Sequence, residues 1–367
     1  ARTAPEVAAV AAVAIEGKES DSSGLKRHGK KAKREAEFKG HGRGWPAPPE
    51  EPKAGECAQL RALWRDHLTL EAERALFPEG GRSGSMEEAA QGLAVLESAL
   101  FGAAGGPHNR GGDASGALSA PEVVVEHLDL IFKWVTVRLC ERESVPVLQR
   151  LLDLVVALLA SLKKRGYSLS EAEQAIFLPH LLEKSANGKQ RFRDLFKRAL
   201  VLVSGCIAGG SSGGGDPAAS ARRAWGSHLL STCAATKRAP CKAVCLLELA
   251  RVVAEAPAVQ GGLAWLEKAR RGAGLSAKGG KAPSMLLEAA CHADSTDSDV
   301  RHAALQVVVA AHGVSGYDAD AVLSLLRPRD RDGSVPNSGS GQLLSSKALK
   351  LVVERLKSDR KDALKRD

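Results

Sequence analysis

Cysteine and histidine are the first residues to consider, because thiolates and imidazoles hold metal ions and carry out nucleophilic chemistry. The chain has seven cysteines and ten histidines. No two cysteines have the Cys-x-x-Cys spacing of a zinc or dithiol site, and only Cys241 and Cys245 lie one helical turn apart. No histidine or second cysteine pair lies at zinc spacing from them. We therefore expect reduced, buried cysteines, no metal site and no cofactor.

Two further patterns that support chemistry are absent from the sequence. The glycine-rich run 210–215 lacks the Lys-Ser/Thr pair of a phosphate-binding loop and follows no predicted strand. The histidines are dispersed, and no serine, histidine and aspartate residues form a constellation with defined spacing. The sequence therefore predicts that the protein is not an enzyme and has no catalytic residues.

Positive charge is concentrated at two predicted turns. The basic residues in or just after these turns are Lys184, Lys189, Arg191, Arg193, Lys237, Arg238 and Lys242. The whole chain has a formal net charge of +9 and a pI near 9.2. This balance favours an acidic partner, which is nucleic acid, a membrane surface or an acidic protein, although a run of charges can also be an ordinary solvated face.

These turns lie between predicted helices. Apolar residues make up 44% of the chain and aromatic residues only 4%, so leucine, alanine and valine provide the core. Such side chains at helical spacing favour helix-on-helix packing, and Phe132 and Trp134 are expected in the core. No apolar run approaches the roughly 20 residues that a membrane span requires, so we expect no span.

Six antiparallel helix pairs with short polar turns are predicted. They cover residues 56–77 and 85–101, 121–141 and 145–165, 171–184 and 189–203, 218–235 and 241–255, 283–292 and 298–312, and 319–326 and 345–357, with a short helical piece at 265–271. Ser170 and Glu173 predict a capping box at the start of the third pair. Repeated pairs of broadly similar length predict an all-α solenoid whose function lies on an exposed rim of turns.

The fifth pair carries the clearest repeat pattern, in the run Asp297-Ser298-Asp299-Val300-Arg301-His302-Ala303-Ala304-Leu305. We expect an acidic turn residue to cap the second helix of this pair. Val300, Ala304 and Leu305 should form its buried stripe, and Arg301 should reach neighbouring turns. This is the pattern of a HEAT repeat.

The rest of the chain divides into linker and inserts. Residues 1–54 are predicted to be a basic, proline-containing disordered linker, because they cannot bury enough apolar surface. The basic run 26–34 fits a nuclear-localisation patch, a contact with nucleic acid, a contact with an acidic protein, or a solvated linker. Glycine-rich inserts at 102–119 and 209–217 interrupt a helical domain at 55–360, and a basic tail follows at 361–367.

Three runs resemble one family specifically: LDLIFKWVTVRL from Leu128, SLSEAEQAIFLPHLLEK from Ser168, and DVRHAALQVVVAAHGVSG from Asp299. They are similar to the TOG domains of the tumour-overexpressed-gene-type microtubule polymerases, and most similar to the fourth TOG domain of the array. Shorter runs fit the same domain in the right order, namely 59–63, 75–77, 92–96, 236–237, 245–249 and 345–357. The resemblance covers roughly residues 50–360.

The resemblance implies a flat paddle of six HEAT-type helix pairs. The turns within the pairs, at 82–86, 142–145, 185–191, 236–239 and 294–301, would form one edge that faces α/β-tubulin or the microtubule lattice. The implied tubulin-binding residues are Ser85, Met86, Glu143, Ser144, Lys189, Gln190, Arg191, Arg193, Lys237, Arg238, Lys242, Asp297, Ser298, Asp299 and Arg301. Further TOG domains in the full-length chain and a cytoplasmic location on microtubules, spindle, centrosome and kinetochore are also implied.

The sequence departs from the family at the first turn, where Met86 occupies the position of a tryptophan in relatives that hold free tubulin tightly. Because aromatic anchors dominate binding hot spots, this implies a weaker contact or one with lattice tubulin. The alternative function is a generic HEAT scaffold that binds another acidic partner, either a protein cargo or RNA. Tubulin binding predicts basic residues confined to the turns, whereas the scaffold predicts a basic stripe along the helices.

Overall fold

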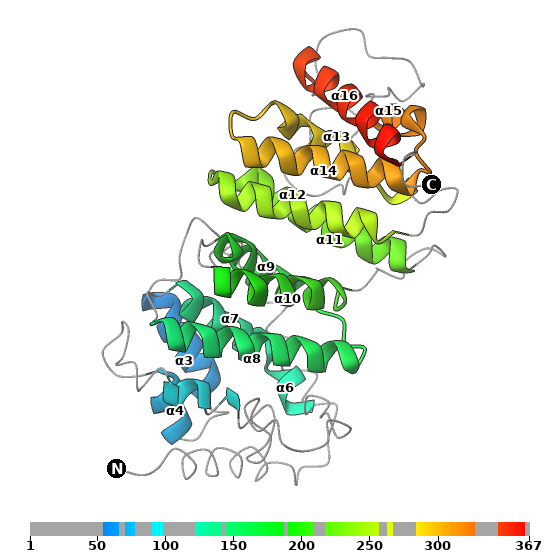
Figure 1. The fold of residues 1–367 in the computed structure, drawn as a ribbon. Coiled ribbons are helices and arrows are strands. Elements are labelled where there is room, and N and C mark those ends of the chain that lie inside the picture. Colours follow the sequence, from blue (N-terminus) through cyan, green and yellow to red (C-terminus); the bar gives the residue numbers. More distant parts are fainter. Residues whose placement is uncertain are drawn as a thin grey trace, which may run out of the picture. The chain divides into compact units, whose positions relative to one another are not determined.

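The structure is a computed structural model that describes residues 54–65, 70–77, 90–94, 96–97, 122–140, 144–186, 190–207, 217–256, 263–266, 284–326 and 344–363. The chain divides into two compact units, Ala1–Cys206 and Ile207–Asp367, here called unit 1 and unit 2. Within the described ranges every regular element is a helix and no extended strand occurs (Figure 1). This confirms the prediction of an all-α fold.

Unit 1 is built from helices that pack in pairs. They are α3 (Ala54–Arg65), α4 (Leu70–Leu76), α6 (Glu122–Glu126), α7 (Leu128–Cys140), α8 (Val145–Lys164), α9 (Glu171–Ser185) and α10 (Gln190–Ser204). The first helices of successive pairs, α7 and α9, pack on each other, and so do the second helices, α8 and α10. The result is two helical layers that are joined at the turn within each pair.

The core of unit 1 contains the two aromatic residues that the sequence places there. Phe132 and Trp134 are 0% and 2% exposed. The ring of Phe132 stacks on that of Phe177 with centroids 4.4 Å apart. Trp134 Nε1 donates a hydrogen bond to the Leu76 carbonyl at 3.0 Å, which leaves no unpaired polar atom on the buried indole. Their predicted core role is confirmed.

Helix α8 is the exception to the expectation that no segment is apolar enough to span a membrane. It is 20 residues long, and by length and composition alone it could cross a bilayer. Half of its residues, however, are buried inside the protein, and Leu151, Leu152, Val155 and Leu159 are fully enclosed. These contacts identify α8 as a core helix of unit 1.

The predicted capping box begins α9. Ser170 Oγ accepts a hydrogen bond from the Glu173 backbone N–H at 3.2 Å, and a Glu173 carboxylate oxygen accepts one from the Ser170 N–H at 2.8 Å. Two backbone donors that a helix start leaves unpaired are thereby satisfied. The Tyr167 hydroxyl also donates a hydrogen bond to a Glu173 carboxylate oxygen. The segment that enters α9 is therefore bound to the first turn of the helix through both Tyr167 and Ser170.

Unit 2 repeats the layered arrangement. Its elements are α11 (Pro217–Ala235), α12 (Ala239–Ala254), η2 (Ala264–Leu266), α13 (Met285–Ala290), η3 (Cys291–Asp294), α14 (Ser298–Val314), α15 (Ala319–Leu326) and α16 (Ser346–Ala363). In one layer α13 packs against both α11 and α15, and in the other α14 packs against both α12 and α16 (Figure 1). Stacked pairs of this kind form a helical solenoid.

The structure differs from the predicted elements in several places. The helix predicted at 121–141 is divided at His127 into α6 and α7, and α16 continues to Ala363 instead of ending at 357. Of the predicted piece at 265–271, only the first residues are described, in η2. On α14, Leu305 is half-buried, whereas Ala303 is fully buried beside Ala304. Residues 1–53 of the predicted linker lie outside the described residues, as do nearly all of the two glycine-rich inserts, whereas Ala54 begins α3.

All seven cysteines are among the described residues and none forms a disulfide; Cys206, Cys233, Cys241 and Cys245 are buried. Burial raises the pKa of Cys206 to about 11, against a smaller lowering by the Lys163 charge. Burial also raises the pKa of Cys233 to about 12. Both thiols are therefore protonated at neutral pH and behave as small core side chains.

Candidate functional site

The turns within the pairs of unit 2 lie close together. They are 236–238 between α11 and α12, 295–297 between η3 and α14, and 344–345 before α16. Cys233 Sγ and His292 Nε2 lie 3.5 Å apart, which brings the end of α11 against η3. Asp294 contacts the start of α16, because Ser345 Oγ donates to its carboxylate at 2.8 Å and Lys347 Nζ lies 3.5 Å from it. We call residues 236–242, 294–301 and 345–347 the turn surface of unit 2.

The fourth-pair turn contributes positive charge to this surface. Thr236 is buried, and its hydroxyl oxygen accepts a hydrogen bond from the Arg238 backbone N–H at 3.2 Å. This contact directs the chain so that Lys237 and Arg238 are exposed. Lys242, in the first turn of α12, is half-buried, and its charge opposes the raised pKa of Cys233. Three cations are therefore presented within one short segment.

The fifth-pair turn is held by the two charged residues predicted to organise it. The Asp297 carboxylate accepts hydrogen bonds from the backbone N–H groups of Asp299 and Val300 at 3.0 and 3.1 Å, so it caps α14 as expected. Arg301 Nη1 donates to the carbonyl oxygens of Ser295 and Thr296 at 2.9 and 2.8 Å. The prediction that Arg301 reaches neighbouring turns is therefore wrong. Arg301 lies in the first turn of α14, next to the segment that enters the helix, so its guanidinium reaches the carbonyl oxygens of that segment first.

The sixth-pair turn is part of the surface although sequence reasoning left it out. Ser345 Oγ donates to Asp294 and also accepts from the Ala348 N–H at 3.0 Å, so one hydroxyl caps α16 and joins it to the fifth turn. Lys347 beside it is 72% exposed. A serine just before a helical stripe is a capping signal that could have located this turn. No sequence pattern indicated the hydrogen bond between Ser345 and Asp294.

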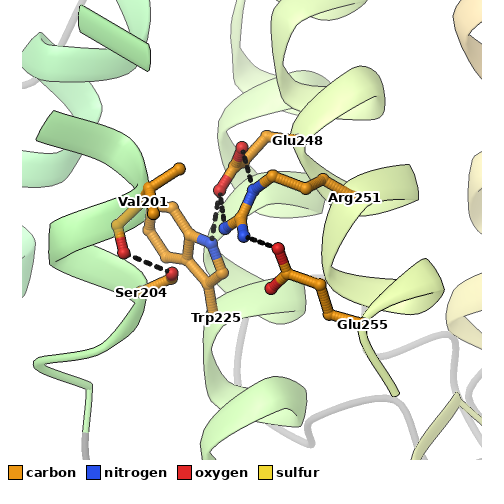
Figure 2. Close-up of polar contacts among 6 residues, drawn as sticks. All are labelled: Val201, Ser204, Trp225, Glu248, Arg251 and Glu255. Carbon is orange, nitrogen blue, oxygen red and sulfur yellow. Dashed lines mark hydrogen bonds and ion pairs between the residues drawn. The ribbon is translucent and has the colours of Figure 1, made fainter. Parts of the chain in front are cut away.

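A polar network centred on the buried Trp225 and Glu248 joins the helices that present the fourth turn, α11 and α12 (Figure 2). The Glu248 carboxylate accepts hydrogen bonds from Trp225 Nε1 at 3.3 Å and from Arg251 Nε at 2.9 Å. Arg251 Nη1 also donates to Glu255 at 2.6 Å. The same view includes a local bond in α10, in which Ser204 Oγ donates to the Val201 carbonyl at 2.9 Å. The Glu248 network fixes the pairing of α11 with α12, and so fixes the direction in which their turn points.

The predicted site residues of unit 1 are described only in part. Ser85, Met86, Glu143 and Lys189 lie outside the described residues, and the side chains of Gln190 and Arg191 are also outside them. Ser144 stands at the N-cap position of α8 without a side-chain cap, and its buried hydroxyl has no hydrogen-bond partner among the described residues. Arg193 is exposed in the first turn of α10.

Histidine, cysteine, aspartate and glutamate side chains are the ones that could bind a metal ion. Within the described residues, no group of three or more of these side chains is arranged to hold one. Two cysteine–histidine pairs occur among them, Cys140 Sγ with His180 Nδ1 at 3.4 Å and Cys233 Sγ with His292 Nε2 at 3.5 Å. Burial lowers the pKa of His292, and the neighbouring Lys242 charge lowers it further.

The sequence matches segments of known proteins, although no family model matches the chain. It is 40% identical over 76 residues to Protein MOR1 from Oryza sativa subsp. japonica, a match that covers 21% of this chain and 4% of that protein. It is 31% identical over 81 residues to Centrosomal protein 224 from Dictyostelium discoideum, covering 22% of this chain and 4% of that protein. The chain thus matches only a small part of these long relatives.

Two solved structures share the fold over nearly the whole chain. One, described as "TOG-tubulin binding specificity promotes microtubule dynamics and mitotic spindle formation", has a TM-score of 0.60 at 18% identity and covers 90% of this chain and 97% of its own. The other, "TOG domain structure from C.elegans Zyg9", has a TM-score of 0.59 at 19% identity and covers 92% and 97%. The chain therefore has the fold of a TOG domain, a solenoid of HEAT-type helix pairs.

Proposed function

We propose that this chain is a tubulin-binding TOG domain of a microtubule polymerase. The observation that carries the proposal is the fourth-pair turn, where Lys237 and Arg238 are exposed beside Lys242 on the turn surface of unit 2. Tubulin is acidic, so positive turns speed its encounter and orient its docking more than they add affinity. A structural neighbour of this fold is described by its binding of tubulin, which supports the same partner.

The proposed activity is binding and delivery of tubulin, without catalysis. The domain would concentrate tubulin or hold the lattice at growing plus ends, and so promote microtubule growth and organise spindle and cytoplasmic microtubules. We further propose that it is the fourth of several TOG domains in a longer chain, located on microtubules, spindle and centrosome. The short sequence matches to long relatives, one of them a centrosomal protein, support this setting.

The proposal is tested by reversing charge at the turn. Lys237→Glu with Arg238→Glu should weaken co-sedimentation with microtubules by about fivefold or more and reduce its salt dependence, because two exposed cations each become repulsive. Gel filtration with free tubulin shows which form the domain prefers. Unchanged binding at low salt, with helicity and melting equal to the parent, would refute the assignment of this turn.

A second candidate function is supported by the exposed face of α10. Arg193, Lys197 and Arg198 are exposed there with only Asp194 among them, so positive charge continues along a helix and away from a turn. This is the pattern expected of a HEAT scaffold that binds another acidic partner, a protein cargo or RNA. Lys197→Glu with Arg198→Glu is the matched control for the turn variant, since it reverses two charges on the same background. If only this pair weakens microtubule binding, the contact lies on the helix face and not on the turns.

A further inference from the structure

The fifth-pair turn is the middle one of the three turns in the turn surface of unit 2, and its aspartates are engaged within the protein to different degrees. The Asp297 carboxylate accepts hydrogen bonds from two backbone N–H groups at the start of α14. The Asp294 carboxylate accepts a hydrogen bond from Ser345 Oγ at 2.8 Å, and Lys347 Nζ lies 3.5 Å from it. Asp299 is exposed in the first turn of α14. Part of the negative charge of this turn is therefore offset internally, which leaves less of it to repel an acidic partner.

Positive charge lies on both sides of the fifth-pair turn. Helix α14 packs against α12 on one side and against α16 on the other (Figure 1). The exposed Lys237 and Arg238 precede α12, and Lys347, whose side chain is 72% exposed, lies at the start of α16. Because packed helices lie about 8–10 Å apart, the two groups of cations are separated by roughly 20 Å across the turn surface.

The position of Lys347 is not explained by the stability of its own helix. Lys347 is the second residue of α16 and Lys242 is the fourth residue of α12, and neither helix has an acidic residue in its first turn. A helix start carries partial positive charge, so a lysine there is unfavourable for the helix. The contact with Asp294 offsets this only in part, because both side chains are exposed to solvent. Together, the helix starts and the lysines present positive potential on the same surface.

We propose that Lys347 is a further tubulin contact, so that the fourth-pair and sixth-pair turns both hold one acidic face of tubulin across the fifth-pair turn. This inference rests on the proposed function and deepens it, because Lys347 lies outside the five turns that the family resemblance implies. Its partner must present carboxylates over a span of roughly 20 Å. An extended acidic segment advances about 3.3 Å per residue, so one shorter than about six residues cannot reach both groups of cations.

The test uses the full chain of 367 residues and co-sedimentation with microtubules. Lys347→Glu should weaken binding about threefold and reduce its salt dependence, because one exposed cation becomes repulsive. Lys357→Glu is the matched control, since it reverses the same charge at an exposed position of the same helix, about 15 Å further along α16, and should leave binding unchanged. Lys347→Gln adds no negative charge beside Asp294, so it should give a smaller loss than Lys347→Glu. Helicity and melting should stay near those of the parent in all three variants.

Combination with the fourth-pair turn shows whether both turns hold the same partner. Lys347→Glu added to Lys237→Glu with Arg238→Glu should bring the loss to about fifteenfold, because the fivefold and threefold losses of separate contacts multiply. A combined loss no larger than that of the fourth-pair variant alone would contradict a contact made by both turns.

The inference and the proposed function fail in different ways. Unchanged binding by Lys347→Glu, or equal losses for Lys347→Glu and Lys357→Glu, would overturn the inference, and the proposed function would stand if the fourth-pair variant still weakens binding. If neither turn variant weakens binding, the proposed function fails as well. Should Lys347→Glu lower the melting temperature, Lys347→Gln decides, since a stably folded Lys347→Gln with unchanged binding would also overturn the inference.

Discussion

Glu248 is predicted to be the residue on which the pairing of α11 and α12 most depends. Its side chain is only 9% exposed, and it accepts hydrogen bonds from both Trp225 and Arg251. Glu248→Ala leaves the buried indole N–H without an acceptor, which costs about 1–3 kcal/mol, and removes a charged hydrogen bond to Arg251. Arg251 is 24% exposed and keeps Glu255 at 2.6 Å, so its charge is not left alone. We therefore expect a loss of about 2–4 kcal/mol, less than the upper range for a broken buried ion pair.

The controls separate burial from charge. Glu255 is 61% exposed, and Glu255→Ala should cost no more than about 1 kcal/mol, the range of a surface ion pair. Glu248→Gln keeps an acceptor for Trp225 and should cost less than Glu248→Ala. Combined with Trp225→Phe in a double-mutant cycle, Glu248→Ala should show a coupling of about 0.5–3 kcal/mol, because the two side chains are in contact.

Urea unfolding gives the free energies, and hydrogen exchange of the α11 and α12 amides locates the loss, which matters in a chain with two compact units. The reasoning is refuted if Glu248→Ala and Glu255→Ala cost the same. It is also refuted if exchange is unchanged in α11 and α12 while the whole chain loses stability.

Four other substitutions test the packing, the cap and the titration of unit 2. Gly226→Ala should destabilise by about 1–3 kcal/mol in urea unfolding, because the new methyl would meet the Met285 side chain, whereas Gly313→Ala on α14 has open space and should stabilise by about 0.5–1 kcal/mol. Asp297→Ala removes the cap of α14 and should cost about 1 kcal/mol in thermal unfolding, and no loss would show that the cap is dispensable. Burial and the Lys242 charge lower the pKa of His292 below its ordinary value of 6.5, so the unfolded chain binds a proton at higher pH than the folded chain does. The free energy of unfolding should therefore fall as the pH drops below about 6.5. His292→Gln should flatten that fall, and an unchanged slope between pH 7 and 5 would contradict the argument.

Local signals in the sequence predicted much of this architecture. The capping box of Ser170 and Glu173 and the cap by Asp297 were predictable, because each involves a helix start and residues two or three positions apart. Phe132 and Trp134 were predictable as core residues because they lie on an apolar helix face. The buried stripe of α14 was only partly predicted: Val300 and Ala304 are buried as expected, but Ala303 is buried as well and Leu305 is only half-buried.

Contacts between distant residues were not predictable. Ser345 and Asp294 are 51 positions apart, and Trp225 and Glu248 are 23 apart, so no spacing rule joins them. The conformation of Arg301 was predicted incorrectly for a related reason. Its guanidinium had several possible acceptors, and the free carbonyls of its own turn were nearest. The proposed binding role of the turn residues stays a prediction.

Hydrogen–deuterium exchange of the chain with and without saturating α/β-tubulin tests the central claim most directly. The proposed function predicts slower exchange in peptides that cover 236–242 and 295–301, the charged turns of unit 2, with no change in the second half of α16. Microtubules should give the same pattern if the lattice is the preferred form. Protection confined to α10, or a complex that forms without protecting either turn, would contradict the claim that tubulin binds the turn surface.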